Sequence, residues 1–299
     1  MTVAAKPLVE MARRPLRGGR RLSLDWLGAL PFLVYVGLFL LLPTTIVVAG
    51  SFVGPDGFTL SNLTAMNKPF IIGAFVNSVA LSAASAVIGA VLGAILAYAV
   101  VTGNPNGVLR RLVVSACGVL AQFGGVTLAF AFIATIARAG FLYLWLQQRG
   151  IDIYAKGDWL YQVSGLVLVY TYFQIPLMVL VFLPALDGIR PQWREATESL
   201  GGGTWHYWRY VAGPLLAPAF FGGLLLLFAN AFSAYATAAA LINQGSIIAS
   251  LLIANTLTSE VGLAQPGLAS ALALVMVVTV AIVMGLYTVL QRRTAKWLQ

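Results

Sequence analysis

Six stretches of the sequence contain no Asp, Glu, Lys, Arg or His, and each is long enough to cross a lipid bilayer as a helix. A helix rises about 1.5 Å per residue, so about 20 apolar residues cross a hydrocarbon core about 30 Å thick. The alternating pattern that typifies the strands of a membrane β-barrel is absent from the sequence. We therefore predict an all-α polytopic membrane protein, with six transmembrane helices at about residues 27–50, 71–102, 112–137, 160–186, 215–242 and 268–290.

The composition supports this class of protein and excludes others. Of the 299 residues, 60% are hydrophobic and only 9% are charged, whereas soluble proteins carry about 25% charged residues. So few charges cannot cover a soluble globule, which excludes an ordinary soluble enzyme. The single Cys117 and the single His206 exclude a disulfide framework and argue against a thiolate or histidine-rich zinc centre. We expect Cys117 to be a buried packing residue and His206 to lie at a solvent-facing rim.

The basic residues divide unequally between the two sets of connecting segments. One set, which includes both termini, holds 14 of the 18 Lys and Arg residues: Lys6, Arg13, Arg14, Arg17, Arg20, Arg21, Arg110, Arg111, Arg190, Arg194, Arg209, Arg292, Arg293 and Lys296. The other set holds Lys68, Arg138, Arg149 and Lys156. Because basic loops remain on the cytoplasmic side, we predict a multi-pass protein of the inner membrane with both termini in the cytoplasm. The net charge of +9 is then explained by topology, without a nucleic-acid partner.

The first apolar run shows how the N-terminal region is organised. It extends over about 24 residues, longer than the roughly 7–15 apolar residues of a cleavable signal peptide, and no A-x-A site follows closely. We interpret it as an uncleaved anchor. Residues 1–26 then form a basic cytoplasmic tail, and residues 27–299 form a single transmembrane domain.

Small residues recur on one side of the second apolar run. They are Ser78, Ser82, Ser85, Ala86, Gly89, Ala90, Gly93, Ala94 and Ala97. Stripes of this kind let helix backbones approach closely in a membrane, where no hydrophobic effect drives helices together. We expect this stripe to pack inside the chain, and an interface between subunits is the alternative.

Several kinds of chemistry have no residues to support them. No titratable side chain lies inside the six spans, although ion-coupled carriers commonly need one. The phosphate-binding pattern G-x-x-x-x-G-K-[ST] and the zinc-protease pattern H-E-x-x-H are both absent. We therefore predict no catalytic and no metal-binding residues, and a conformational machine moved by a partner protein.

The segment between the fourth and fifth spans, residues 187–214, is the most informative connection. Pro191 suits the first turn of a helix, and Gly201-Gly202-Gly203 should end that helix because glycine accepts positive φ. A second short helix with Trp205, Tyr207 and Trp208 should follow, and Pro214 should open the next span. So many aromatic residues exceed the needs of a connector and favour docking into a groove of another protein.

This segment resembles the EAA loop of the membrane subunits of ATP-binding-cassette importers. That loop reads E-A-A, three residues, Gly, nine residues, Ile, one residue and Leu-Pro. The same spacing places Glu195-Ala196-Thr197, Gly201, Val211 and Gly213-Pro214 at the corresponding positions. Thr197, Val211 and Gly213 depart from the pattern, and Gly213 should loosen the entry to the fifth span. Six spans with cytoplasmic ends also fit the transmembrane-domain fold of type I importers.

The resemblance implies a permease subunit of an ATP-driven solute importer. It implies that the segment docks on a separate ATPase, which binds ATP and Mg²⁺, so that this chain is not itself an enzyme and needs no cofactor. It also implies a second permease subunit, an extracytoplasmic solute-binding protein and contact with membrane lipid. The coupling residues would be Glu195, Ala196, Thr197, Leu200, Gly201, Trp205, Trp208, Val211 and Pro214. The alternatives are an aromatic belt at the membrane surface for the Trp residues and a solvated surface charge for Glu195.

Uncharged polar residues inside the spans are the candidates for a translocation pathway. The residues that we single out are Gln122, Tyr170, Gln174, Asn230 and Ser233; further candidates are Thr127, Thr135, Thr171, Tyr172, Tyr235 and Thr237. Pro176 should kink the fourth span beside Gln174, and polar side chains at a kink suit a water-filled cavity. The alternative for each residue is a hydrogen bond that holds two helices together.

The solute and the outer loops are less constrained. Residues 172–177 and Asn77-Ser78 resemble permeases of the polyamine, phosphonate and ferric-ion branch, so we expect a small polar solute such as one of these. The absence of acidic residues from the spans argues against tight polyamine binding within the chain. Residues 140–146 are expected to form an interfacial helix. An ion-coupled secondary transporter and a membrane-embedded enzyme remain the alternative functions.

Overall fold

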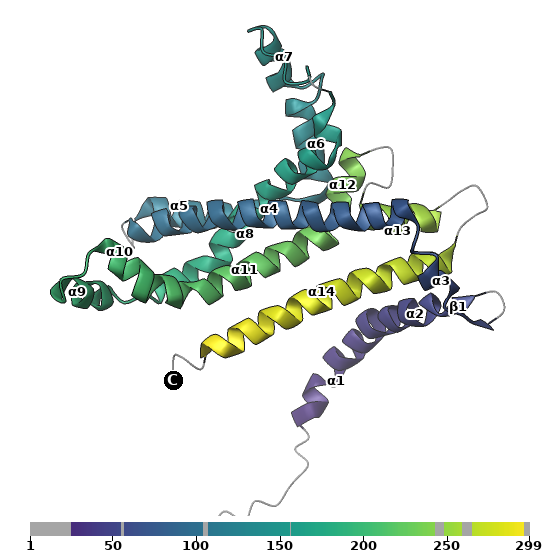
Figure 1. Ribbon diagram of the computed structural model, residues 1–299, viewed down its shortest axis with the longest axis horizontal. Helices are drawn as coiled ribbons and strands as arrows, with labels where there is room; N and C mark the ends of the chain where they lie inside the picture. Colours follow the sequence, from purple (N-terminus) through teal and green to yellow (C-terminus); the bar gives the residue numbers. More distant parts are fainter. Residues whose placement is uncertain are drawn as a thin grey trace, which may run out of the picture. The chain divides into compact units, whose positions relative to one another are not determined.

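The computed structural model describes residues 25–54, 57–103, 107–155, 157–242, 248–258 and 265–295 (Figure 1). The predicted basic tail lies almost wholly outside these residues. The chain divides into two compact units, residues 1–46 and 47–299. Within the described residues, six helical segments are long and apolar enough to cross a membrane: Gly28–Ser51, Pro69–Thr102, Gly125–Gln147, Val163–Asp187, Thr204–Ser233 and Pro266–Val289. The predicted polytopic, mainly helical fold is therefore confirmed.

The first unit is the helical segment that begins the transmembrane region. It contains α1 (Asp25–Val36), the π-helical turn η1 (Gly37–Leu41) and the first part of α2 (Leu42–Ser51). Most of its large apolar side chains between Leu30 and Ile46 are exposed. Such a surface is expected of a helix that meets lipid, and it agrees with the predicted first span.

The second unit consists of helices and one small hairpin. The hairpin pairs β1 (Val53–Gly54) with β2 (Gly57–Phe58) in antiparallel register. The helices are α3 (Ser61–Thr64), α4 (Pro69–Thr102), α5 (Val108–Leu120), α6 (Gly125–Ile136), α7 (Phe141–Gln147), η2 (Trp159–Tyr161), α8 (Val163–Asp187), α9 (Pro191–Ser199), α10 (Thr204–Tyr207), η3 (Trp208–Ala212), α11 (Gly213–Ser233), α12 (Ala236–Leu241), α13 (Ala249–Thr258) and α14 (Pro266–Ala295).

Helices α4 and α8 pack closely side by side and form the framework of this unit. A Cβ atom at Gly89 would lie 2.7 Å from Cβ of Gln174, and one at Gly93 would lie 2.5 Å from Cβ of Met178. Sequence numbers rise together along this contact, so the two helices run in the same direction, as the predicted alternation of spans requires. The small residues of α4 thus pack inside the chain, as predicted.

Serine side chains add polar contacts along the same face of α4. Ser78 Oγ accepts a hydrogen bond from the backbone N–H of Ala249 at 2.8 Å. Ser85 Oγ accepts one from Nε2 of Gln174, also at 2.8 Å. Small hydroxyls therefore serve two purposes here, because they permit close packing and also supply hydrogen-bond partners in an apolar interior.

The third predicted span differs from the structure. The apolar run 112–137 is not one helix, because α5 ends at Leu120 and α6 begins at Gly125, whose φ is +68°. The candidate span Gly125–Gln147 instead joins α6 to α7 through a turn that contains Arg138. Residues 121–124 contain no charged side chain, so a search for charge-free runs does not detect this break.

The fifth predicted span also differs from the structure. The helix does not run from 215 to 242; it begins at Thr204 and ends at Ser233. The backbone is extended at Ala234, and α12 starts a new helix at Ala236. Ser233 Oγ donates to the carbonyl of Ala229 at 3.0 Å, which satisfies one acceptor near this end.

One end of the second unit brings together the ends of α4 and α8 and the start of α5 (Figure 1). Arg110 forms a 2.6 Å ion pair with Asp187, which joins the start of α5 to the last residue of α8. The ring of Trp208 meets that of Tyr98 edge to face, at 5.3 Å between centroids. Residues 187–214 therefore lie at the same end as the connection between α4 and α5, in agreement with their predicted common side. Cys117, on α5, is buried as predicted.

Candidate functional site

The first candidate site is the segment that resembles the EAA loop, and local chemistry explains its shape. Pro191 occupies the first turn of α9, as predicted. Gly201 has φ of +78°, a left-handed conformation that glycine adopts without cost. The N–H of Gly202 then donates to the carbonyl of Thr197 at 2.9 Å, and this 6→1 bond is typical of a helix C-terminus of the Schellman type. The predicted glycine stop is confirmed.

Helix α9 has one face toward the rest of the segment and one face free. Trp193 and Thr197 are half-buried, and Thr197 Oγ1 donates to the carbonyl of Trp193 at 2.8 Å. Glu195 and Ala196 are exposed on the other side. Arg194 Nε contacts Glu198 Oε1 at 3.0 Å, and this hydrogen bond raises the pKa of Arg194. Thr197, the departure from the EAA pattern, therefore faces inward, while the two residues that match the pattern are accessible.

The second half of the segment differs from the prediction. Residues 204–233 form one continuous helical segment, so helix is already present before Pro214, which lies in the first turn of α11. Pro214 lacks an N–H, and just before it the helix widens into the π-helical turn η3, where the N–H of Gly213 donates to the carbonyl of Trp208. A Cβ at Gly213 would collide with that same carbonyl oxygen. Gly213 therefore permits the π turn and does not interrupt the helix.

The aromatic residues of this segment have different environments. Tyr207 is buried, and Trp208 is half-buried against Tyr98 of α4, so Trp208 anchors the segment to the helix bundle. Trp205 is 70% exposed and Tyr210 is 69% exposed. His206 is exposed, as predicted for a rim residue.

Three large side chains give this end of the molecule an apolar surface. Leu200 is 90% exposed, and with Trp205 and Tyr210 it forms what we name the coupling face, together with the exposed Glu195 and Ala196. Val211 is half-buried and Pro214 is exposed along the adjoining helix. Exposed apolar side chains close in sequence to an exposed carboxylate suit docking into a protein groove.

The second candidate site is a polar cavity of about 310 Å³ in the second unit. It lies where two helices are interrupted, between α5 and α6 and between α11 and α12. Phe173 of α8 completes its wall. The other lining residues are Ala121, Gln122, Gly124, Gly125, Asn230, Ser233, Ala234, Tyr235, Ala236 and Thr237. Non-helical backbone at membrane depth is tolerated where it lines a water-filled cavity. A cavity at this position therefore accounts for the two helix breaks.

Three of the five main pathway candidates meet in this cavity. Gln122, Asn230 and Ser233 line it, and so do the further candidates Tyr235 and Thr237. The glycine pair Gly124-Gly125 was missed, although a glycine pair beside Gln122 is a recognisable signal for a helix break.

The remaining candidates have other roles in this conformation. Tyr170 is buried behind the cavity, and its hydroxyl donates to the carbonyl of Ala234 at 2.9 Å, which supports the extended backbone at the break. Gln174 is fully buried between α4 and α8, where it bonds Ser85, and its Oε1 has no partner among the described residues. The prediction that Gln174 lines the pathway is therefore wrong here, and the alternative of a contact between helices holds. Thr135 and Thr171 bond carbonyls of their own helices.

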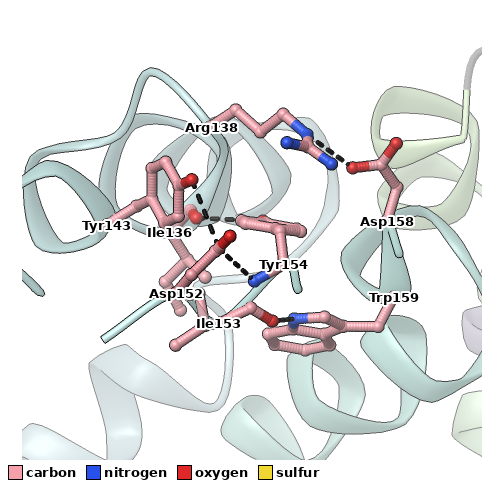
Figure 2. Close-up of polar contacts among 8 residues, drawn as sticks. All are labelled: Ile136, Arg138, Tyr143, Asp152, Ile153, Tyr154, Asp158 and Trp159. Atoms are coloured by element: carbon pink, nitrogen blue, oxygen red, sulfur yellow. Dashed lines mark hydrogen bonds and ion pairs between the residues drawn. The ribbon is translucent and has the colours of Figure 1, made fainter. Parts of the chain in front are cut away.

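The connection between α6 and α8 is a third ordered region, shown in Figure 2. Arg138 contacts Asp158 at 2.8 Å, and Asp152 accepts hydrogen bonds from the hydroxyl of Tyr143 and the N–H of Tyr154. The Tyr154 hydroxyl bonds the carbonyl of Ile136 at 2.9 Å, and burial raises the pKa of Tyr154. A helix forms at Phe141–Gln147, close to the predicted residues 140–146. These contacts give the connection a defined surface.

Among the described residues, no group of three or more His, Cys, Asp or Glu side chains is placed to hold a metal ion. In the described part of the chain, the two candidate sites are therefore an exposed, largely apolar surface and an uncharged polar cavity.

Comparisons with known proteins agree with this geometry. Residues 126–296 match the family described as binding-protein-dependent transport system inner membrane component. The chain is 27% identical over 108 residues to the thiamine transport system permease protein ThiP of Escherichia coli (strain K12), covering 36% of this chain. It is 31% identical over 111 residues to the sulfate transport system permease protein CysT of the same organism, covering 37% of this chain. The matches span 20% and 36% of the length of these curated relatives.

Solved structures show the same fold. A bacterial ABC transporter involved in the import of the acidic polysaccharide alginate matches with a TM-score of 0.68 and 14% identity, covering 91% of this chain and 95% of that chain. An inward-facing form of the MetNI methionine ABC transporter matches with a TM-score of 0.56 and 15% identity, covering 75% of this chain and 95% of that chain. The fold is thus that of the membrane domains of these importers.

Proposed function

The chain belongs to the family of binding-protein-dependent transport system inner membrane components, and from this membership we propose that it is the permease subunit of an ATP-driven solute importer. In this proposal the coupling face docks on a separate ATPase subunit, and the polar cavity is part of the solute pathway. The observation that supports coupling most strongly is the exposed apolar surface of Leu200, Trp205 and Tyr210, placed beside the EAA-like residues.

The helix from Thr204 to Ser233 supplies a mechanical link between the two sites. Its 30 residues extend over about 45 Å, from the coupling face to the break that lines the cavity. A displacement of the end near Trp205 would therefore be transmitted along this helix to Ser233. Closure of the ATPase on ATP would move the coupling face and thereby reshape the cavity, and hydrolysis would reverse the movement.

The remaining partners follow from the same proposal. ATP and Mg²⁺ are held by the ATPase, and this chain needs no cofactor of its own. A second permease subunit completes the pathway, and an extracytoplasmic solute-binding protein delivers the solute, with the ordered connection of Figure 2 as its landing surface. The solute is a small polar compound of the polyamine, phosphonate or ferric-complex type, consistent with uncharged polar side chains around the cavity.

The decisive experiment changes the coupling face in the assembled transporter. Glu195→Lys reverses the charge on the exposed face of α9, while Glu195→Gln keeps the size and removes only the charge. We expect Glu195→Lys to abolish ATP-dependent uptake and co-purification of the ATPase, although the protein still inserts in the membrane; Glu195→Gln should retain part of both. Normal uptake by Glu195→Lys would refute the coupling assignment. Uptake by the isolated chain under a proton or sodium gradient would establish an ion-coupled carrier instead.

A further inference from the structure

The polar cavity lies at the N-terminal end of α6, a helix of 12 residues. The first N–H groups of a helix have no acceptor inside the helix, and the helix dipole gives this end a partial positive charge. The residue at the N-cap position is Gly124, which has no side chain to accept these donors. Gly124 and Gly125 both line the cavity, so the first residue of α6 lies at its wall.

A second and independent feature of the same cavity is the hydroxyl of Thr237. This residue is only 2% exposed and lines the cavity. Its hydroxyl forms no hydrogen bond with any residue that the structure describes. Since Thr237 lines the cavity, this hydroxyl is available to water or to a ligand there. The preceding residue, Ala236, has its Cβ 3.7 Å from the position of a Cβ built on Gly125, so Thr237 and the start of α6 border the same space.

The charges around the cavity favour one sign of ligand. None of its lining residues carries a formal charge. A cationic solute would find no carboxylate there, whereas an anion meets a helix N-terminus, the Thr237 hydroxyl and the amide groups of Gln122 and Asn230. Anions at helix N-termini are a common mode of binding, and in transporters with broken helices such ends face anionic groups of the substrate.

We propose that this cavity binds a small tetrahedral oxyanion, such as a phosphonate or sulfate group, through the N-terminus of α6 and Thr237. This inference rests on the proposed function, because it names the class of solute that crosses through the same cavity. The volume of about 310 Å³ is at the lower end for ligand sites and suits a small solute. Of the three solute types named under the proposed function, an oxyanion site favours the phosphonate type and disfavours polyamines.

The test uses a substitution that places a carboxylate where the anion would bind. Gly124 has a negative φ, and a Cβ built on it meets no atom within 4 Å, so a side chain fits there without strain. Gly124→Asp would cap α6 with its own carboxylate and occupy the anion position, and an N-cap Asp does not threaten folding. Gly124→Ala adds only a methyl group and is the matched control.

Binding is measured on the full chain in lipid nanodiscs by equilibrium dialysis with labelled sulfate and labelled methylphosphonate, at constant ionic strength. We expect saturable binding of at least one oxyanion, weakened tenfold or more by Gly124→Asp and changed less than twofold by Gly124→Ala. Thr237→Val removes the hydroxyl at nearly constant volume and should weaken binding threefold to tenfold. Thr135→Val is its control, because the Thr135 hydroxyl bonds Ala131 of its own helix at 2.8 Å.

Three results would overturn the oxyanion site. They are the absence of saturable binding of both oxyanions, equal affinity of Gly124→Asp and Gly124→Ala, and displacement of the bound oxyanion by choline at the same concentrations as by sulfate. These results leave the proposed function standing if ATP-dependent uptake by the assembled transporter still depends on Glu195. Conversely, normal uptake by Glu195→Lys removes the coupling proposal without affecting the dialysis result.

Discussion

Adding one methyl group at three glycines of α4 tests whether the close contact with α8 holds the bundle together. At Gly93 the new Cβ would lie 2.7 Å from the carbonyl oxygen of Ile175 and 2.5 Å from Cβ of Met178. At Gly89 it would lie 2.7 Å from Cβ of Gln174. At Gly73 it would meet no atom within 4 Å, so Gly73→Ala is the matched control on the same helix.

The magnitudes follow from two opposing terms. Overpacking a core costs about 1–3 kcal/mol, and replacing glycine by alanine in a helix gains up to about 1 kcal/mol. Gly93→Ala faces a backbone atom that cannot rotate away, so we expect a net loss of about 2–3 kcal/mol in the free energy of unfolding. Gly89→Ala meets one atom within 3.0 Å, where Gly93→Ala meets three, so it should lose about 1–2 kcal/mol. Gly73→Ala should be neutral or should gain up to about 1 kcal/mol.

The assay is equilibrium unfolding of the full chain from mixed micelles by a denaturing detergent, followed by tryptophan fluorescence and circular dichroism. We expect the free energy of unfolding to be lowest for Gly93→Ala, intermediate for Gly89→Ala and highest for Gly73→Ala. Equal stability of Gly93→Ala and Gly73→Ala would refute the close α4–α8 contact as a source of stability.

Three other substitutions test separate contacts. Ser85→Ala leaves the buried amide of Gln174 without its partner and should lower the free energy of unfolding by about 1–2 kcal/mol. In a double-mutant cycle with the same unfolding assay, the double variant with Gln174→Leu should lose less than the sum of the two single variants. Gly201→Val, which disfavours positive φ, should reduce ATP-dependent uptake and ATPase co-purification, whereas Gly201→Asn tolerates this conformation and should retain most of both; equal effects would contradict the role of the turn. Tyr154→Phe removes the hydrogen bond to Ile136 and should lower the free energy of unfolding by about 0.5–1.5 kcal/mol, measured by thermal unfolding, with no change expected if that bond is absent in the membrane.

Sequence reasoning succeeded where one local property suffices. The coupling segment illustrates this: Pro191 begins α9 and Gly201 ends it, because a fixed φ and a freely positive φ are properties of single residues. It failed at residues 121–124 and at 234–235, where the sequence stays free of charged residues although both helices break. At this second break the carbonyl of Ala234 accepts a hydrogen bond from Tyr170, a partner 64 residues away, and no local pattern contains that contact.

The sequence alone therefore determined the class of the protein, its apolar spans, the family resemblance and the turn at Gly201, because hydropathy, spacing and backbone preference are read along the chain. Only the tertiary structure decided that Gln174 binds Ser85 inside the bundle while Gln122, Asn230 and Thr237 border one cavity. Each of these is an uncharged polar residue in an apolar run, and its role depends on which helix faces it. In an apolar interior a polar group without a partner is costly, and for Gln174 the partner Ser85 is supplied by packing between distant segments.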